Sequence, residues 1–154
     1  MKTQKEVNLA LNEALAQELV GINQHFLHAR MLRNWGYDKL ADFDYKLSIE
    51  AMKQADKIVQ RIFLLEGLPN LQNLGKLLIG ESVPEILACD AKTQETLRNA
   101  LAKAIALVEE KEDFVSRDTL EDILKSCEET IDKLEEQKHL CDDLGLEKYH
   151  QSIA

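Results

Sequence analysis

Carboxylates and imidazoles at helical spacing are the groups in this sequence best suited to metal chemistry. Glu18 and His25 fall on a stripe of residues three or four apart, and the stripe also contains Val7, Leu11, Ala14, Ile22 and Ala29. This spacing places the stripe on one face of a helix. Because its other members are apolar, Glu18 is expected to be buried. A buried carboxylate needs a metal ion, a hydrogen-bonding partner or a proton.

The histidines offer few further ligands. His25 lies seven residues from Glu18, about 10 Å along a helix axis, so we expect a core or lining group that hydrogen-bonds a neighbour. The Glu-x-x-His spacing, which puts two ligands on one helix face, occurs as Glu136/His139 and Glu147/His150. The first pair lies more than two turns beyond Cys127 and the second lies beyond Gly145, so neither faces Glu18 at the right level, and we expect both to be solvated surface pairs.

The composition restricts the class of protein. The chain has 154 residues, 19 Lys and Arg against 28 Asp and Glu, and a net charge of −9. This acidity argues against binding to nucleic acid or to anionic membranes. The longest stretch without a charged residue is 11 residues, Leu19 to Ala29, far short of the roughly 20 that a membrane span needs. Three cysteines without C-x-x-C spacing indicate reduced thiols, and hence a cytoplasmic protein.

The elements that position these groups are long helices. Glycines and prolines divide the chain into four amphipathic segments, 4–35, 38–66, 84–111 and 113–143, followed by a short segment, 146–153. Ser82 and Pro84 with Glu85 are typical of a helix start, and Gly145 of a helix stop. The connection from residue 67 to 83 is long for neighbouring helices. We therefore expect one all-α domain over 1–154, a four-helix bundle with a crossover between helices 2 and 3 and a short fifth helix.

Each of the first two helices has a second apolar face. In the first helix this face contains Leu15, Leu19, Ile22, Asn23 and Phe26, and in the second it contains Tyr45, Ile49, Met52, Asp56, Val59 and Phe63. A surface helix of a monomeric bundle needs only one apolar face. The pattern indicates a dimer built on these helices; the alternative is a broad face on unusually buried helices.

The sequence resembles bacterioferritin along nearly its whole length. The resemblance rests on residues 18–20, 22–24, 26–30 and 34–36, on the crossover at 65–72, 74–76 and 79–81, and on 114–118. It implies a ferritin-like fold and a hollow shell of two dozen subunits, built from dimers, that stores mineralised iron. It also implies haem b between paired subunits and a ferredoxin docking outside.

The resemblance also implies where a di-iron ferroxidase centre would lie, but most of its ligands are missing. The positions for its carboxylates and histidines hold Glu18, Ala51, Gln54, Gln94, Cys127 and Thr130. Only Glu18 keeps the expected type, so we expect no intact di-iron site and no confident catalytic residue. We expect a hydrogen-bonded remnant instead, in which Gln54 and Thr130 bond to Glu18. A weak metal role for Glu18, with Cys127 and His25, is the alternative.

The haem positions implied by the resemblance are kept. Met52 occupies the axial ligand position, and the pocket residues are Leu19, Ile22, Asn23, Phe26, Tyr45, Ile49 and Lys53, with Lys53 and Arg30 near the propionates. The surface for the ferredoxin electron donor is Leu68, Pro69, Asn70, Lys76, Ile79, Glu81 and Glu85.

These expectations combine into one leading hypothesis. In this hypothesis the chain is a haem-carrying iron-storage subunit that lacks ferroxidase activity of its own and shares a mixed shell with a ferroxidase-active ferritin subunit. Two alternatives remain open. One is an oxidase with a remodelled metal site around Glu18, His25 and Cys127, and the other is a haem or electron-transfer cage that holds no mineral.

Overall fold

The computed structural model describes residues 4–154, and this part of the chain is helical with no strand. The helices are α1 (Lys5–Asn34), α2 (Asp38–Leu64), α3 (Val83–Glu110), α4 (Phe114–Leu144) and α5 (Leu146–Ile153). They match the five segments predicted from the sequence to within one or two residues at each end. The expected all-α class, the four-helix bundle and the short fifth helix are confirmed.

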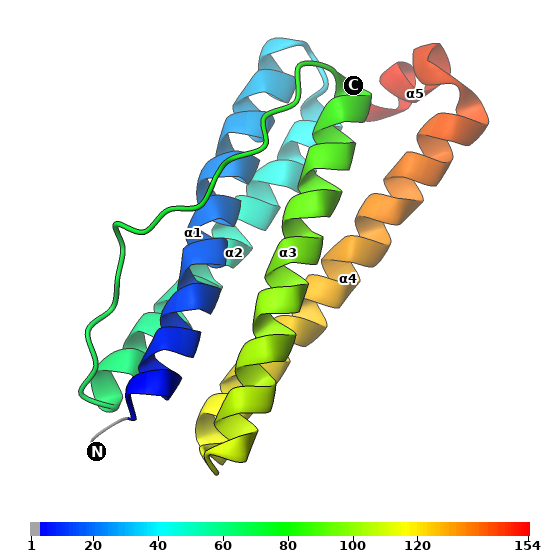
Figure 1. Ribbon diagram of the computed structural model, residues 1–154. Helices are drawn as coiled ribbons and strands as arrows, with labels where there is room; N and C mark the ends of the chain where they lie inside the picture. The colour runs from blue at the N-terminus through cyan, green and yellow to red at the C-terminus, as the bar shows by residue number, and fades with distance from the viewer. Residues whose placement is uncertain (1–3) are drawn as a thin grey trace.

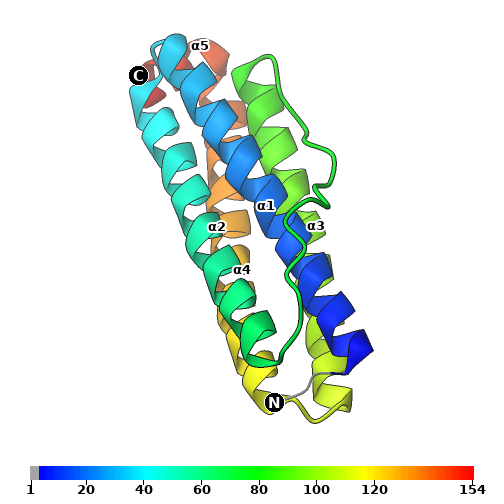
Figure 2. The same ribbon diagram turned by 90° about the vertical axis from the view of Figure 1, so that its left-hand side faces the viewer.

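A long crossover sets the direction of the helices. Residues 65–82 leave the end of α2 and run along α1 for the length of the bundle before α3 begins (Figures 1 and 2). Because of this crossover, α2 and α3 run in the same direction, while α1 and α4 run in the other (Figure 1). Such a connection is the mark of a ferritin-like bundle among four-helix folds.

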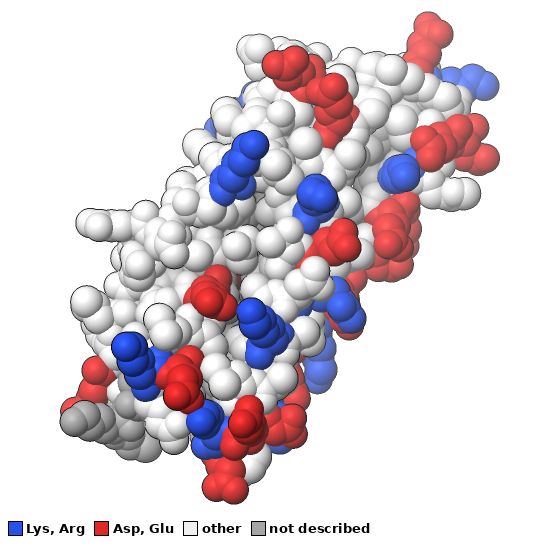
Figure 3. All heavy atoms as spheres, viewed as in Figure 1, with Lys and Arg blue, Asp and Glu red and all other residues white. Residues whose placement is uncertain are grey.

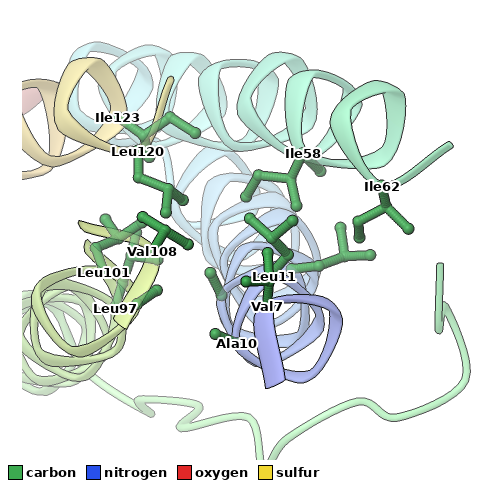
Figure 4. Close-up of a cluster of buried hydrophobic side chains, with 14 of the residues drawn as sticks. Val7, Ala10, Leu11, Ile58, Ile62, Leu97, Leu101, Val108, Leu120 and Ile123 are labelled. Atoms are coloured by element: carbon green, nitrogen blue, oxygen red, sulfur yellow. The ribbon is translucent and has the colours of Figure 1, made fainter. Parts of the chain in front are cut away.

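The bundle interior consists of two apolar clusters with a polar layer between them. One cluster includes Leu11, Ile58, Leu101 and Leu120, whose side chains point toward one another from α1, α2, α3 and α4 (Figure 4). The other includes Leu32, Leu40, Ile86, Leu134 and Tyr149, and lies where α5 covers the end of the bundle. Each fully buried aliphatic side chain stabilises the fold by about 1.5–3 kcal/mol. The two clusters therefore hold the polar residues between them in fixed positions.

Side chains of α1 hold the crossover in place. Asn12 donates to the Leu68 carbonyl at 3.1 Å and accepts from the Asn70 amide at 2.7 Å. Farther along, Gln24 Oε1 accepts from the Leu78 amide at 2.9 Å, and His28 Nε2 accepts from the Gly80 amide at 3.0 Å. Each bond satisfies a backbone group that has no partner in a helix or strand.

Gly80 is required by close approach rather than by its backbone conformation. A Cβ added there would lie 2.5 Å from the backbone nitrogen of Ile86 in the first turn of α3. The crossover therefore turns into α3 through a space that no other residue fits.

The ends of α3 and α4 carry the signals read from the sequence. Ser82 Oγ accepts from the Glu85 amide at 3.4 Å, and Glu85 Oε2 accepts from the Glu81 amide at 2.8 Å, so each side chain satisfies a free donor at the helix start. Asp113 caps α4 by accepting from the Ser116 amide at 3.1 Å. Gly145, with φ of 81°, ends α4 as predicted.

Charged groups are confined mostly to the surface. Acidic and basic side chains alternate over the face shown in Figure 3, and acidic ones gather along its α4 edge. Within residues 4–154 no helix combines the length and the apolar character that crossing a membrane requires.

Candidate functional site

The polar layer brings Glu18 against Gln54. Both side chains are buried, at 1% and 6% exposure. With the Gln54 amide nitrogen turned toward Glu18, it donates to Oε2 at 2.5 Å and to Oε1 at 3.2 Å, while the amide oxygen accepts from Ser126 Oγ at 3.0 Å. Burial raises the pKa of Glu18 well above its usual range, although His25 opposes this and Glu50 adds to it. In this orientation the hydrogen bond expected between Gln54 and Glu18 forms; in the opposite one, Gln54 Nε2 donates to Glu50 Oε1 at 3.4 Å.

Thr130 and Cys127 bond elsewhere. Thr130 Oγ1 donates to the Ser126 carbonyl of its own helix at 3.1 Å, so the expectation that it bonds to Glu18 is wrong. The carbonyl one turn back is the nearest acceptor to a helical threonine. Cys127 Sγ donates to the Gln94 carbonyl at 3.3 Å. Burial raises the pKa of Cys127 to about 12, with Glu18 and Glu128 adding to the effect, so its thiol is protonated.

His25 belongs to a separate buried cluster. Its Nδ1 lies 2.7 Å from Asp44 Oδ1 of α2 and 3.4 Å from Asp90 Oδ1 of α3. Its Nε2 lies 3.0 Å from Gln94 Nε2. His28 Nδ1 approaches the same Asp90 oxygen at 2.7 Å, and Gln24 Nε2 donates to it at 3.1 Å. The expectation that His25 is a buried group hydrogen-bonded to a neighbour is confirmed.

The charges in this cluster compensate one another. Burial alone lowers the pKa of His25, but Asp90 and then Asp44 raise it to about 10. Burial favours the neutral form of Asp90, yet His25 and the bonds from both histidines hold the pKa of that carboxyl below its usual range. Burial and the Asp90 charge raise the pKa of Asp44 well above its usual range. The cluster therefore contains an imidazolium, a carboxylate and a neutral acid, with no net charge left buried. An imidazolium has no lone pair, so Gln94 must then present its oxygen to the ring.

Sequence reasoning missed most of this cluster. Asp44 was not singled out, and Asp90 and His28 were given no site role. Their spacing along the helices could have indicated that they are buried. Asp44 and Ser48 precede the buried Ala51 at helical spacing, and Asp90 lies four residues before Gln94. In each case a polar residue interrupts a buried face, as Glu18 does in α1.

A second face of the bundle, formed by α1 and α2, is apolar and open. Met52 is 52% exposed, and Phe26 and Tyr45 beside it are 46% and 38% exposed. The Arg30 guanidinium lies over both rings, 5.2 Å from the Phe26 centroid and 5.4 Å from the Tyr45 centroid. The other members of this face are Leu19, Ile22 and Ile49, half-buried, and Asn23 and Lys53, exposed. The predicted second stripe is thus largely a surface that one chain leaves uncovered, but Leu15 was wrongly placed on it, because it is fully buried in the first apolar cluster.

The comparisons with known proteins agree with this architecture. The family described as ferritin-like domain matches residues 8–144. A bacterioferritin of Mycobacterium tuberculosis is 42% identical over 149 residues, covering 97% of this chain and 94% of its own. A bacterioferritin of Brucella melitensis is 39% identical over 154 residues, covering all of this chain and 96% of its own. The chain belongs to the bacterioferritin family. A bacterial ferritin of Pseudomonas aeruginosa is also similar, at 41% identity over 153 residues and 99% of each chain.

The residues at the di-iron positions do not fit two iron ions. A bacterioferritin di-iron centre needs bridging carboxylates and a terminal imidazole for each ion. This chain offers one buried carboxyl group packed against Gln54, together with a methyl group, two amides, a protonated thiol and a hydroxyl bonded to its own helix. Among the described residues, His25, Asp44 and Asp90 are the group whose ligand atoms converge, all within 4.8 Å, and neither Glu18 nor Cys127 belongs to it.

The two Glu-x-x-His pairs and the predicted ferredoxin surface lie at the outside of the bundle. Glu136, His139 and Glu147 are exposed as expected, but the expectation that His150 is solvated is wrong, because it is half-buried and stacks on Tyr37 with ring centroids 4.6 Å apart. The seven residues of the predicted ferredoxin surface lie along the crossover and the start of α3, where all but the half-buried Pro69 are exposed.

Proposed function

We propose that this bacterioferritin chain is an iron-storage subunit that binds haem between two copies of itself and depends on a ferroxidase-active ferritin subunit in the same shell. The chain supplies shell wall, haem and the docking surface for a small ferredoxin. Its partner supplies ferrous oxidation. The observation that carries the proposal is the contrast between two sites in one bundle: the di-iron positions are closed by hydrogen bonds, whereas the Met52 face is open.

The residues of the Met52 face fit a haem on a two-fold axis. The thioether of Met52 is exposed at the middle of an apolar surface, and each of two paired copies would present one sulfur from opposite sides. Leu19, Ile22 and Ile49 would pack on the ring, and Lys53 with Arg30 would pair with the propionates. Haem with two thioether ligands supplies one-electron transfer at a raised potential.

Release of stored iron would use this arrangement with the crossover surface. The mixed surface around Lys76 and the exposed Leu68 and Ile79 would give a ferredoxin both charge pairing and apolar contact. The crossover bonds to Asn12, Gln24 and His28 of α1, whereas the Met52 face uses Leu19, Ile22 and Phe26 of the same helix.

Haem binding is tested with two methionine variants. Met52→Leu keeps the apolar volume but removes the sulfur, while Met31→Leu, on α1 and half-buried, is the matched control. We expect the Soret band of the reconstituted protein to be lost or strongly shifted in Met52→Leu and unchanged in Met31→Leu, with the shell intact in both. An unchanged spectrum in Met52→Leu would remove the haem role from the proposal.

A further inference from the structure

The buried cluster of His25, Asp44 and Asp90 has the geometry of a metal site. Ligand atoms bound to one ion at about 2.1 Å are themselves about 3.0–3.4 Å apart. His25 Nδ1 lies 2.7 Å from Asp44 Oδ1 and 3.4 Å from Asp90 Oδ1. The ligand atoms of the three residues all lie within 4.8 Å of one another, so an ion would draw them together and would displace the protons that His25 and Asp44 carry without it. The three residues come from α1, α2 and α3, so a single ion would join three helices.

The groups around these three residues are arranged as supports for metal ligands. A ligating imidazole ordinarily donates its other N–H to an oxygen, and ligating carboxylates are themselves hydrogen-bonded. Here the second nitrogen of His25 faces the Gln94 amide at 3.0 Å. Asp90 is held by Gln24 at 3.1 Å and by His28 at 2.7 Å. Gln24 is fixed in turn by the Thr93 hydroxyl and the Leu78 amide, both at 2.9 Å.

We propose that His25, Asp44 and Asp90 bind one divalent ion of the zinc type in the interior of the subunit. One imidazole and two carboxylates suit Zn²⁺, Co²⁺ or Fe²⁺, whereas Mg²⁺ and Ca²⁺ prefer oxygen ligands alone. The side chains are at most 2% exposed, so the site is closed and its ion is structural. The site is distinct from Glu18 and Cys127, and it requires neither haem nor a mixed shell.

Cobalt serves as the probe, because its visible absorption reports the ligands. Chelator-treated, haem-free protein is titrated with Co²⁺, comparing the unchanged chain with Asp44→Asn and with Asp42→Asn. Asp42 is the matched control, since it lies on the same helix but pairs with Arg33 at the exposed surface. We expect one tight Co²⁺ per chain in the unchanged protein and in Asp42→Asn. Asp44→Asn should bind it at least about tenfold more weakly.

Crystals of the unchanged chain soaked in Zn²⁺ give the second measurement, which holds even if Asp44→Asn folds poorly. We expect an anomalous peak between His25 Nδ1, Asp44 and Asp90. No peak there, a peak at Glu18 and Cys127 instead, or equal Co²⁺ affinity in Asp44→Asn and Asp42→Asn would overturn the proposal.

Discussion

The Gln54 amide packs against the Glu18 carboxyl group inside the bundle and, with its nitrogen turned toward Glu18, donates to both oxygens at 2.5 and 3.2 Å. This bond occupies the place where the family resemblance puts a metal ligand pair. It also provides the partner that a buried carboxyl group requires. The neighbouring positions follow the same pattern, because Cys127 and Thr130 bond to backbone carbonyls. The side chains at these positions are therefore part of the hydrogen-bonded interior.

Removing the amide should leave Glu18 without its partner. We expect Gln54→Leu to lower the free energy of unfolding by about 1–3 kcal/mol, because a buried polar group loses its hydrogen bond. Gln60→Leu, on the exposed side of α2 where Gln60 donates to Asp56, is the control and should change stability by no more than about 0.5 kcal/mol. Urea unfolding measures both, and equal effects would contradict the structural role of Gln54.

Asp113 should make the free energy of unfolding depend on pH in the acid range. It caps α4 and accepts from Arg61 at 2.7 Å. Burial opposes ionisation, but the bonds from Ser116 and Arg61 hold the pKa of Asp113 below its usual range. A lowered folded-state pKa gives stability that is present above the unfolded pKa, near 4, and is lost as pH falls through the folded value.

The same contacts predict the effect of replacing Asp113. We expect Asp113→Ala to cost about 0.5–2 kcal/mol at pH 7, the usual effect of losing a helix cap, and to flatten the acid limb of the stability profile. Asp118→Ala, at an exposed position on the same helix, should leave that limb unchanged. Thermal unfolding from pH 3 to pH 7 measures both, and parallel profiles for Asp113→Ala and the unchanged chain would refute the assignment.

Two glycines should respond to alanine in opposite directions. At Gly80 the new Cβ would meet the Ile86 backbone at 2.5 Å, and we expect a loss of about 1–3 kcal/mol from overpacking. At Gly21, inside α1, the nearest atom is Ala51 Cβ at 3.6 Å, an ordinary contact. Gly21→Ala should stabilise by about 0.5–1 kcal/mol, since alanine is the better helix former. Loss of stability in Gly21→Ala, or none in Gly80→Ala, would show that the packing differs from this description.

The helices were predictable because their signals are local. Ser82, Glu85 and Gly145 mark helix ends by their own backbone chemistry, and the breakers between helices are few. The polar layer was predictable only in part. Glu18 was identified because it interrupts an apolar stripe and Gln54 by family position, but His25 meets Asp44 and Asp90 across 19 and 65 residues of chain. Helical spacing places a residue on a face, but it does not say which polar residue of another helix it meets. Thr130 shows the same limit, since its nearest acceptor lay on its own helix.

We expect this chain not to oxidise ferrous iron at the six di-iron positions. The direct measurement is the rate of Fe²⁺ oxidation by the purified chain, by its Glu18→Gln variant, and by mixed shells with a ferroxidase-active ferritin subunit. We expect the chain and Glu18→Gln to oxidise iron equally slowly, and the mixed shells to oxidise it at a rate that rises with the partner's share. Fast oxidation by the chain alone, abolished in Glu18→Gln, would contradict the account.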